Sequence, residues 1–98
     1  MAVNVCSGIT GKAGDSFQWQ NGNTLAVIAA PVTTWPLPAS SYTVQPNNVA
    51  TASITINPSS VPGDSAYTVN WAVSRPGFAA PCGANAPNPK IVVTTTKR

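Results

Sequence analysis

Residues 65–73 have the sequence SAYTVNWAV, in which large apolar side chains alternate with small or polar ones. A period of two residues is typical of a β-strand with one buried face. The alternation directs one set of side chains inward, namely Tyr67, Val69, Trp71 and Val73. No segment of the chain has the period of about 3.6 residues that an amphipathic helix requires, so the sequence predicts an all-β protein.

Shorter segments with related patterns are expected to form the other strands, at residues 2–6, 15–20, 24–29, 41–44, 49–56 and 90–96. The second of these alternates clearly, with Phe17 and Trp19 inward. In the fifth, the residues expected inward are Ala50, Ala52, Ile54 and Ile56. The 41–44 segment is short enough for a sheet edge, where an unpaired strand can support association. We therefore expect a monomer or a weak dimer.

Glycine, proline and asparagine separate these segments. Gly8 and Gly11 are expected to end the first strand, and Asn21-Gly22 predicts a tight hairpin between the second and third. Prolines are expected to exclude regular pairing across residues 31–40, and residues 58–64 are expected to form a turn. The 75–89 segment is a long loop rich in proline, glycine and asparagine, a length that is unusual unless the loop is functional or held in place.

These features predict a two-sheet β-sandwich of about seven strands, built as a single domain over residues 1–98. A chain of 98 residues can bury one two-layer core. Its apolar content of 43% is that of an ordinary globular protein.

The composition excludes most catalytic chemistry. The chain has no histidine and no glutamate, and its carboxylate side chains are Asp15 and Asp64, each following a glycine at an expected turn. Without a histidine there is no Ser-His-Asp arrangement and no base to activate the many hydroxyls. We therefore expect no enzyme, no catalytic residues, no cofactor and no metal site.

Charge and hydropathy also limit the partners. The positive charges are few and scattered, whereas nucleic-acid binding requires a cluster of them. No apolar run approaches the roughly 20 residues of a membrane span, because the longest covers only residues 25–32. We expect neither nucleic-acid binding nor membrane insertion.

The cysteines are Cys6, near the start, and Cys82, in the long loop. An even number of cysteines in a small loop-rich domain favours a disulfide, which would stabilise by roughly 4 kcal/mol; two unpaired thiols are the alternative. A disulfide and a surface rich in Ser, Thr and Asn indicate a secreted or periplasmic protein, whose export signal we expect to have been removed ahead of Met1.

Three segments carry a family resemblance. Residues 12–21 (KAGDSFQWQN), 62–69 (PGDSAYTV) and 88–93 (NPKIVV) resemble, in this order, strands of the cupredoxins, the small blue-copper β-sandwiches. The resemblance implies a cupredoxin-like fold. Copper in that family is held by two histidines, a cysteine and usually a methionine. Here Thr24, Leu25 and Ala26 follow the first segment, and Trp71 stands where the cysteine ligand is expected, so no ligand is carried over.

An immunoglobulin-like sandwich is the alternative fold, although Cys6 and Cys82 are not at its usual mid-strand positions. The function expected is a non-catalytic binding or structural module that recognises a protein or a carbohydrate through loop aromatics. The alternatives are an immunoglobulin-like adhesion or carbohydrate-binding accessory domain and an electron-transfer copper protein with unusual ligands.

The loop aromatics are Trp35, among prolines, and Phe78, near Arg75 in the long loop. Trp35 either covers one end of the sandwich or contacts a sugar ring or a partner protein. If both loops meet at one end, as the resemblance implies, then Trp35, Arg75 and Phe78 form one contact patch.

Overall fold

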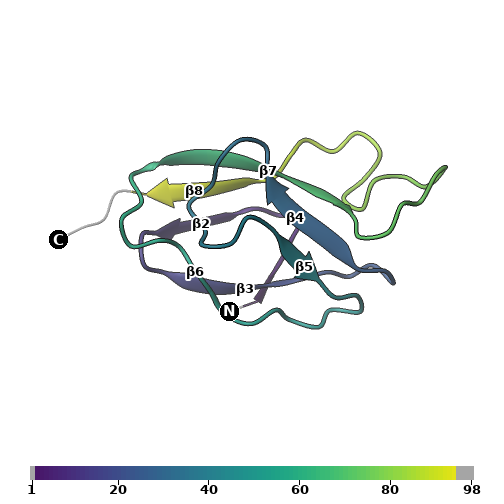
Figure 1. The fold of residues 1–98 in the computed structure, drawn as a ribbon, viewed down its shortest axis with the longest axis horizontal. Helices are drawn as coiled ribbons and strands as arrows, with labels where there is room; N and C mark the ends of the chain where they lie inside the picture. The colour runs from purple at the N-terminus through teal and green to yellow at the C-terminus, as the bar shows by residue number, and fades with distance from the viewer. Residues whose placement is uncertain (1, 95–98) are drawn as a thin grey trace.

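The computed structural model describes residues 2–94, which contain eight strands and no helix (Figure 1). The strands are β1 (Ala2–Asn4), β2 (Ile9–Lys12), β3 (Ser16–Gln20), β4 (Val27–Pro31), β5 (Tyr42–Val44), β6 (Ile54–Thr55), β7 (Gly63–Trp71) and β8 (Lys90–Thr94). They form two sheets, one in the order β1-β3-β6 and the other in the order β2-β8-β7-β4-β5. The predicted all-β, sandwich-like fold is therefore confirmed.

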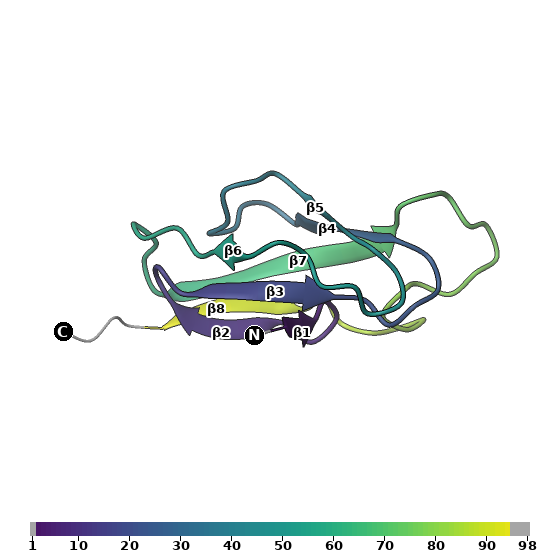
Figure 2. The same ribbon diagram turned by 90° about the horizontal axis from the view of Figure 1, so that it is seen from below.

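Each sheet contains one parallel pair. β1 runs parallel to β3 and β2 runs parallel to β8, whereas every other pair of neighbouring strands is antiparallel. Since β1 and β2 follow one another along the chain but lie in different sheets, the short segment between them joins the sheets. Figures 1 and 2 show β7 as the long strand of the molecule, and the loop that follows it projects from the side where β7 ends and β8 begins.

The strand that suggested the fold is present but shifted toward the N-terminus. β7 begins at Gly63 and ends at Trp71, whereas the pattern predicted residues 65–73. Tyr67 and Val69 are buried as expected. The prediction of an inward Val73 is wrong, because Val73 lies beyond the strand and is 73% exposed.

The prediction that prolines exclude pairing from residue 31 onward is wrong at Pro31, because this residue belongs to β4 and pairs with Tyr67 of β7 without the loss of a ladder hydrogen bond. Ala72 N donates to Ala26 O and Val32 N donates to Ala66 O, so the even-numbered residues of β4 bond toward β7. Pro31, which has no N–H, occupies an odd-numbered position. The odd-numbered residues Val27 and Ala29 direct their backbone N–H and C=O groups toward β5. Both residues are fully buried.

The first strand ends ahead of Gly8, in agreement with the sequence, but the expectation that Gly11 also interrupts strand structure is wrong. Residues 9–12 form β2 beside β8, with Gly11 in register with Val93. Gly8 instead allows the turn into β2, because its φ of 69° is unfavourable for other residues. A Cβ at Gly8 would also stand 2.6 Å from the carbonyl oxygen of Lys90, so β2 could not approach β8 so closely.

The hairpin predicted at Asn21-Gly22 is also wrong. β3 and β4 belong to different sheets, so the chain crosses between the sheets at this point. Asn21 is 1% exposed, and its Nδ2 donates to Leu25 O at 2.8 Å and to Val44 O at 3.4 Å. Its Oδ1 accepts from Asn23 N at 2.9 Å. The side chain thus replaces the hydrogen bonds that a hairpin ladder would have supplied.

The strand predicted over residues 49–56 is largely absent. Only Ile54–Thr55 forms β6, and Ala50 and Ala52 are exposed instead of buried. Thr51 holds the irregular segment to β3, since its N–H donates to Trp19 O and its Oγ1 accepts from Trp19 N. A crossover loop with these bonds satisfies the backbone without a continuous strand.

β1 ends at residue 4 instead of 6, and β4 covers residues 27–31 instead of 24–29. β5 and β8 agree with the sequence. β5 occupies the edge of the five-stranded sheet, as expected for residues 41–44. β8 buries Ile91 and Val93. The predicted extension of the last strand to residues 95 and 96 lies outside the described residues.

An aromatic cluster occupies the centre of the core. Trp19 is fully buried, and its ring centroid lies 5.1 Å from Phe17, 5.2 Å from Tyr67, 5.9 Å from Tyr42 and 6.0 Å from Trp35. The Trp19 Nε1 group has no hydrogen-bond partner within residues 2–94. The apolar contacts of the ring must therefore outweigh the cost of burying this donor.

Candidate functional site

The long loop is fixed to the sandwich by a disulfide. Cys6, just after β1, is bonded to Cys82 with a Cα–Cα distance of 5.5 Å, so the predicted bridge is confirmed. The bond joins positions 76 residues apart. Asn23 Nδ2 also donates to Pro81 O at 3.3 Å. The loop between β7 and β8 is therefore held at its middle instead of at its ends alone.

A tight turn at the start of this loop brings Arg75 and Phe78 together. Phe78 N donates to Arg75 O at 3.1 Å, and Pro76 and Gly77 occupy the central positions, with a φ of 81° at Gly77. Proline followed by a positive-φ glycine is the residue order of a type II turn. The Arg75 guanidinium carbon consequently lies 3.9 Å from the centroid of the Phe78 ring, a cation–π contact.

Apolar side chains continue this surface onto the strands. Leu25, Trp71, Val73 and Arg75 line a hollow of about 200 Å³. Trp71, which was expected to point inward, is only partly buried, and its Nε1 donates to Ala79 O at 2.9 Å. Phe78 is 59% exposed and Leu25 is 38% exposed. We call Leu25, Trp71, Val73, Arg75 and Phe78 the loop face.

Arg75 has no acidic side chain near it. The carboxylate side chains of the protein are Asp15 and Asp64. Asp64 is in register with Val92 near the start of β7, whereas Arg75 follows the end of that strand. Asp15 Oδ2 accepts from the backbone N–H of Lys12, which ends β2 beside Thr94. Both carboxylates thus lie at the other end of the strands, and the loop face presents an uncompensated positive charge.

Trp35 is not part of this surface. The chain leaves β4 toward the start of β7, and Trp35 lines a hollow with Gly63 and Val93. Its ring lies 5.8 Å from Tyr42, and its Nε1 donates to Ala39 O at 2.8 Å. The structure therefore brings Arg75 and Phe78 together and places Trp35 at the opposite end of β7, so the three residues do not form one patch.

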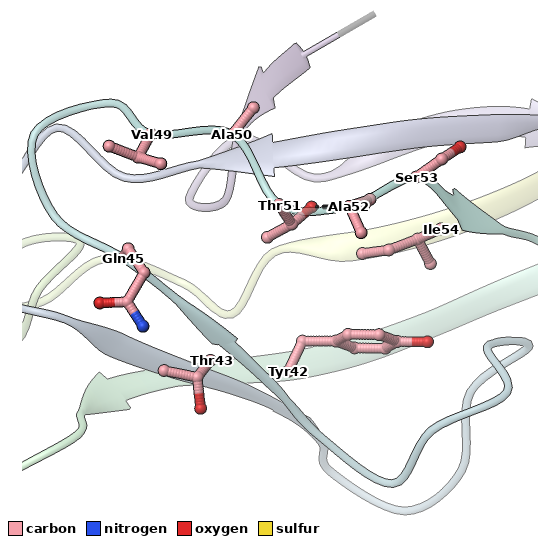
Figure 3. Close-up of a pocket in the computed structure, with 9 residues that line it drawn as sticks. All are labelled: Tyr42, Thr43, Gln45, Val49, Ala50, Thr51, Ala52, Ser53 and Ile54. Carbon is pink, nitrogen blue, oxygen red and sulfur yellow. Dashed lines mark hydrogen bonds between the residues drawn. The ribbon is translucent and has the colours of Figure 1, made fainter.

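A third hollow lies between the edges of the two sheets. Figure 3 shows Tyr42, Thr43 and Gln45, from β5 and the residue after it, across from the segment that leads into β6. Its volume is about 240 Å³. Thr51 Oγ1 within it donates to Ala52 O at 2.8 Å. Apart from the Tyr42 phenol, no side chain that lines this hollow is titratable, so the hollow has no pair of groups for acid–base catalysis.

Residues 2–94 contain neither a cluster of metal-binding side chains nor a helix that could span a membrane. No group of three or more His, Cys, Asp or Glu side chains is arranged to hold a metal ion. No helix in this part of the chain is long and apolar enough to cross a membrane.

Sequence reasoning missed several residues of the loop face. Leu25 was expected inside a strand, and Trp71 and Val73 were expected to be buried. The turn sequence Arg75-Pro76-Gly77-Phe78 was a usable signal for the contact between its first and last side chains. No local signal marked Asn21, because its partners include the distant Val44.

Comparison of the chain with protein-family models, with curated proteins and with solved structures finds no match. The geometry of the molecule itself therefore carries the functional argument.

Proposed function

We propose that this protein is an exported, non-catalytic binding module with a cupredoxin-like fold and no copper, and that it binds a partner protein through the loop face. The observation that carries this proposal is the exposed cluster of Leu25, Val73 and Phe78 around an unpaired Arg75. Exposed aromatic and arginine side chains are the residues that most often dominate binding energy in protein interfaces.

The resemblance to cupredoxins gains support from where its three segments lie. They supply β3 of one sheet and β7 and β8 of the other. These strands also provide much of the core, namely Phe17, Trp19, Tyr67, Val69, Ile91 and Val93. Because the resemblance covers core strands of both sheets, it supports the fold of the whole domain. A resemblance confined to surface loops would support it less.

The immunoglobulin-like alternative is less well supported. Immunoglobulin constant domains consist of two antiparallel sheets with a disulfide between facing strands. This chain has a parallel pair in each sheet. Its disulfide joins two loop positions, Cys6 and Cys82. These differences favour the cupredoxin-like arrangement.

Export is supported by the disulfide, because such bonds persist mainly in oxidising compartments. The partner we propose has an apolar side chain beside a carboxylate. The apolar group would occupy the hollow at Trp71, and the carboxylate would pair with Arg75. Such a pair gains specificity from the charge and affinity from the burial of apolar area.

A displayed library of random peptides tests the proposal. We expect wild-type protein to enrich peptides in which an aromatic or aliphatic residue stands near Asp or Glu. Arg75→Gln and Phe78→Ala should each weaken binding of the enriched peptides about thirtyfold or more, since interface hot spots contribute about 2 kcal/mol or more. Val61→Ala is the matched control, because Val61 is 77% exposed and lies just before the start of β7, far from the loop face.

Two results would contradict the proposal. One is a selection that yields no acidic, apolar peptides. The other is enriched peptides that bind the Arg75 and Phe78 variants as tightly as they bind wild type. Addition of Cu(II) distinguishes the proposed copper-free module from the copper-protein alternative. An intense visible absorption band would indicate a thiolate–copper site and would favour the alternative.

A further inference from the structure

Trp35 lines a groove at the end of the molecule away from the loop face. The groove has a volume of about 460 Å³ and lies between the loop after β4 and the segment that leads into β7. Asn57 N donates to Pro36 O at 2.9 Å, so the two sides are joined by a backbone hydrogen bond. This volume is within the range of small-molecule binding sites in proteins.

The lining of the groove combines a flat apolar surface with hydrogen-bonding groups. The apolar part includes Trp35 and Pro62, and the polar side chains include those of Asn57, Ser60, Asp64 and Ser65. None of the side-chain hydrogen bonds found among residues 2–94 uses these four polar groups. They are therefore free to bond a ligand.

Trp35 is held in place before any ligand binds. Its Nε1 donates to Ala39 O at 2.8 Å, and its ring packs 6.0 Å from Trp19 and 6.1 Å from Tyr67. Because these contacts fix the orientation of the indole, a ligand that stacks on it does not have to order a free side chain. A pre-ordered aromatic ring beside polar groups suits a ligand that has both an apolar face and hydroxyls.

Charge narrows the class of ligand. Among residues 2–94, Asp64 is the sole charged residue that lines the groove, so its carboxylate would repel an anionic ligand. A purely apolar ligand would bury Asn57, Ser60 and Ser65 without hydrogen bonds, which is costly. A neutral sugar ring avoids both penalties, since its C–H face can pack on Trp35 while its hydroxyls donate to the Asp64 carboxylate.

We propose that this groove binds one unit of a neutral carbohydrate chain, with Trp35 as the stacking platform and Asp64 as the main hydroxyl acceptor. The site is separate from the loop face, because Asp64 lies at the start of β7, whereas Arg75 lies beyond its other end. The result of the peptide selection therefore neither supports nor contradicts this carbohydrate site.

The test is titration of wild-type protein with a panel of short neutral oligosaccharides (glucans, mannans, galactans and N-acetylglucosamine oligomers). Calorimetry and tryptophan fluorescence measure the binding. We expect saturable binding of at least one of them with a change in fluorescence. Asp64→Asn should weaken this binding about tenfold, the effect of losing a charge-assisted hydrogen bond. Phe78→Ala, at the loop face, is the matched control and should leave the affinity unchanged.

Trp35→Ala should abolish binding, but Trp35 also packs against the core, so its variant must first show a native circular dichroism spectrum. Asp64→Asn keeps the test decisive if the Trp35 variant is unfolded, because Asp64 is exposed. The proposal is overturned if no neutral oligosaccharide binds or if Asp64→Asn binds as tightly as wild type.

Discussion

The hydroxyl of Tyr67 donates a hydrogen bond of 2.7 Å to the backbone carbonyl of Val5, and both residues are fully buried. Tyr67 belongs to β7 in the five-stranded sheet, and Val5 follows β1 of the three-stranded sheet. This bond therefore connects the two layers directly across the core. It also satisfies a carbonyl just before Cys6, where the chain leaves the first strand.

Replacement of Tyr67 by phenylalanine should destabilise the fold by about 1–3 kcal/mol, because Val5 O would remain buried without a donor. The free energy of unfolding, measured by urea denaturation, checks this prediction. Tyr42→Phe is the matched control. Its hydroxyl accepts a longer bond of 3.3 Å from Ala39 N in a partly buried position, so a smaller loss is expected. Equal losses for the two variants would contradict a special role for the Tyr67 bond.

Alkaline pH should also act through Tyr67. Burial disfavours the phenolate and raises the pKa of Tyr67 well above the ordinary value of about 10. Above about pH 10 the unfolded chain loses this proton while the folded chain keeps it, so the unfolded state binds fewer protons. The contribution of Tyr67 to the free energy of unfolding is then constant below about pH 10. Above about pH 10 the free energy of unfolding falls by about 1.4 kcal/mol per pH unit. Urea denaturation across this range should show a steeper fall for wild type than for Tyr67→Phe, and parallel curves would refute the assignment.

Loss of the disulfide should cost roughly 4 kcal/mol, because the bond closes a segment whose ends are 76 residues apart. Thermal unfolding of a Cys6→Ala/Cys82→Ala variant measures this loss. Wild type treated with dithiothreitol should unfold at nearly the same temperature as the variant, which controls for the packing of the two side chains. An unchanged unfolding temperature would show that the loop is held by its other contacts.

Asn21→Ala should destabilise the protein by about 2–3 kcal/mol, because it leaves the backbone groups of the β3–β4 crossover without partners. Asn70→Ala provides the comparison, since Asn70 is exposed on β7 and should change stability by less than about 0.5 kcal/mol. Hydrogen exchange adds a local readout. Asn47 and Asn48 N–H groups bond to Asn23 and Asn21 carbonyls, and they should exchange faster in the Asn21 variant.

Part of the molecule follows from local sequence patterns. Alternation alone identified β3, β7 and β8 and the burial of Trp19, Tyr67 and Ile91. The pattern failed over residues 49–53, where alternating alanine and threonine also suits an exposed crossover segment. Alanine is small enough for either environment, so its position in an alternating pattern carries little information about burial.

The candidate sites were less predictable than the fold. Arg75 and Phe78 meet through a turn that their own sequence encodes. Trp35 stands apart from them because β4 and β7 are antiparallel, so the chain leaving β4 and the chain leaving β7 emerge at opposite ends. The groove at Trp35 depends on residues from the 57–65 segment, which local patterns do not connect to Trp35.

The sequence by itself determined the all-β class, the principal core side chains, the edge strand and the scarcity of groups for catalysis. Each of these depends on which side chains occur and on how they alternate within a few residues. Tertiary structure alone decided which strands pair, that Asn21 bridges two sheets instead of turning a hairpin, and that the loop aromatics occupy opposite ends. Strand pairing uses the backbone groups that all residues share, so its outcome depends on how the whole core packs.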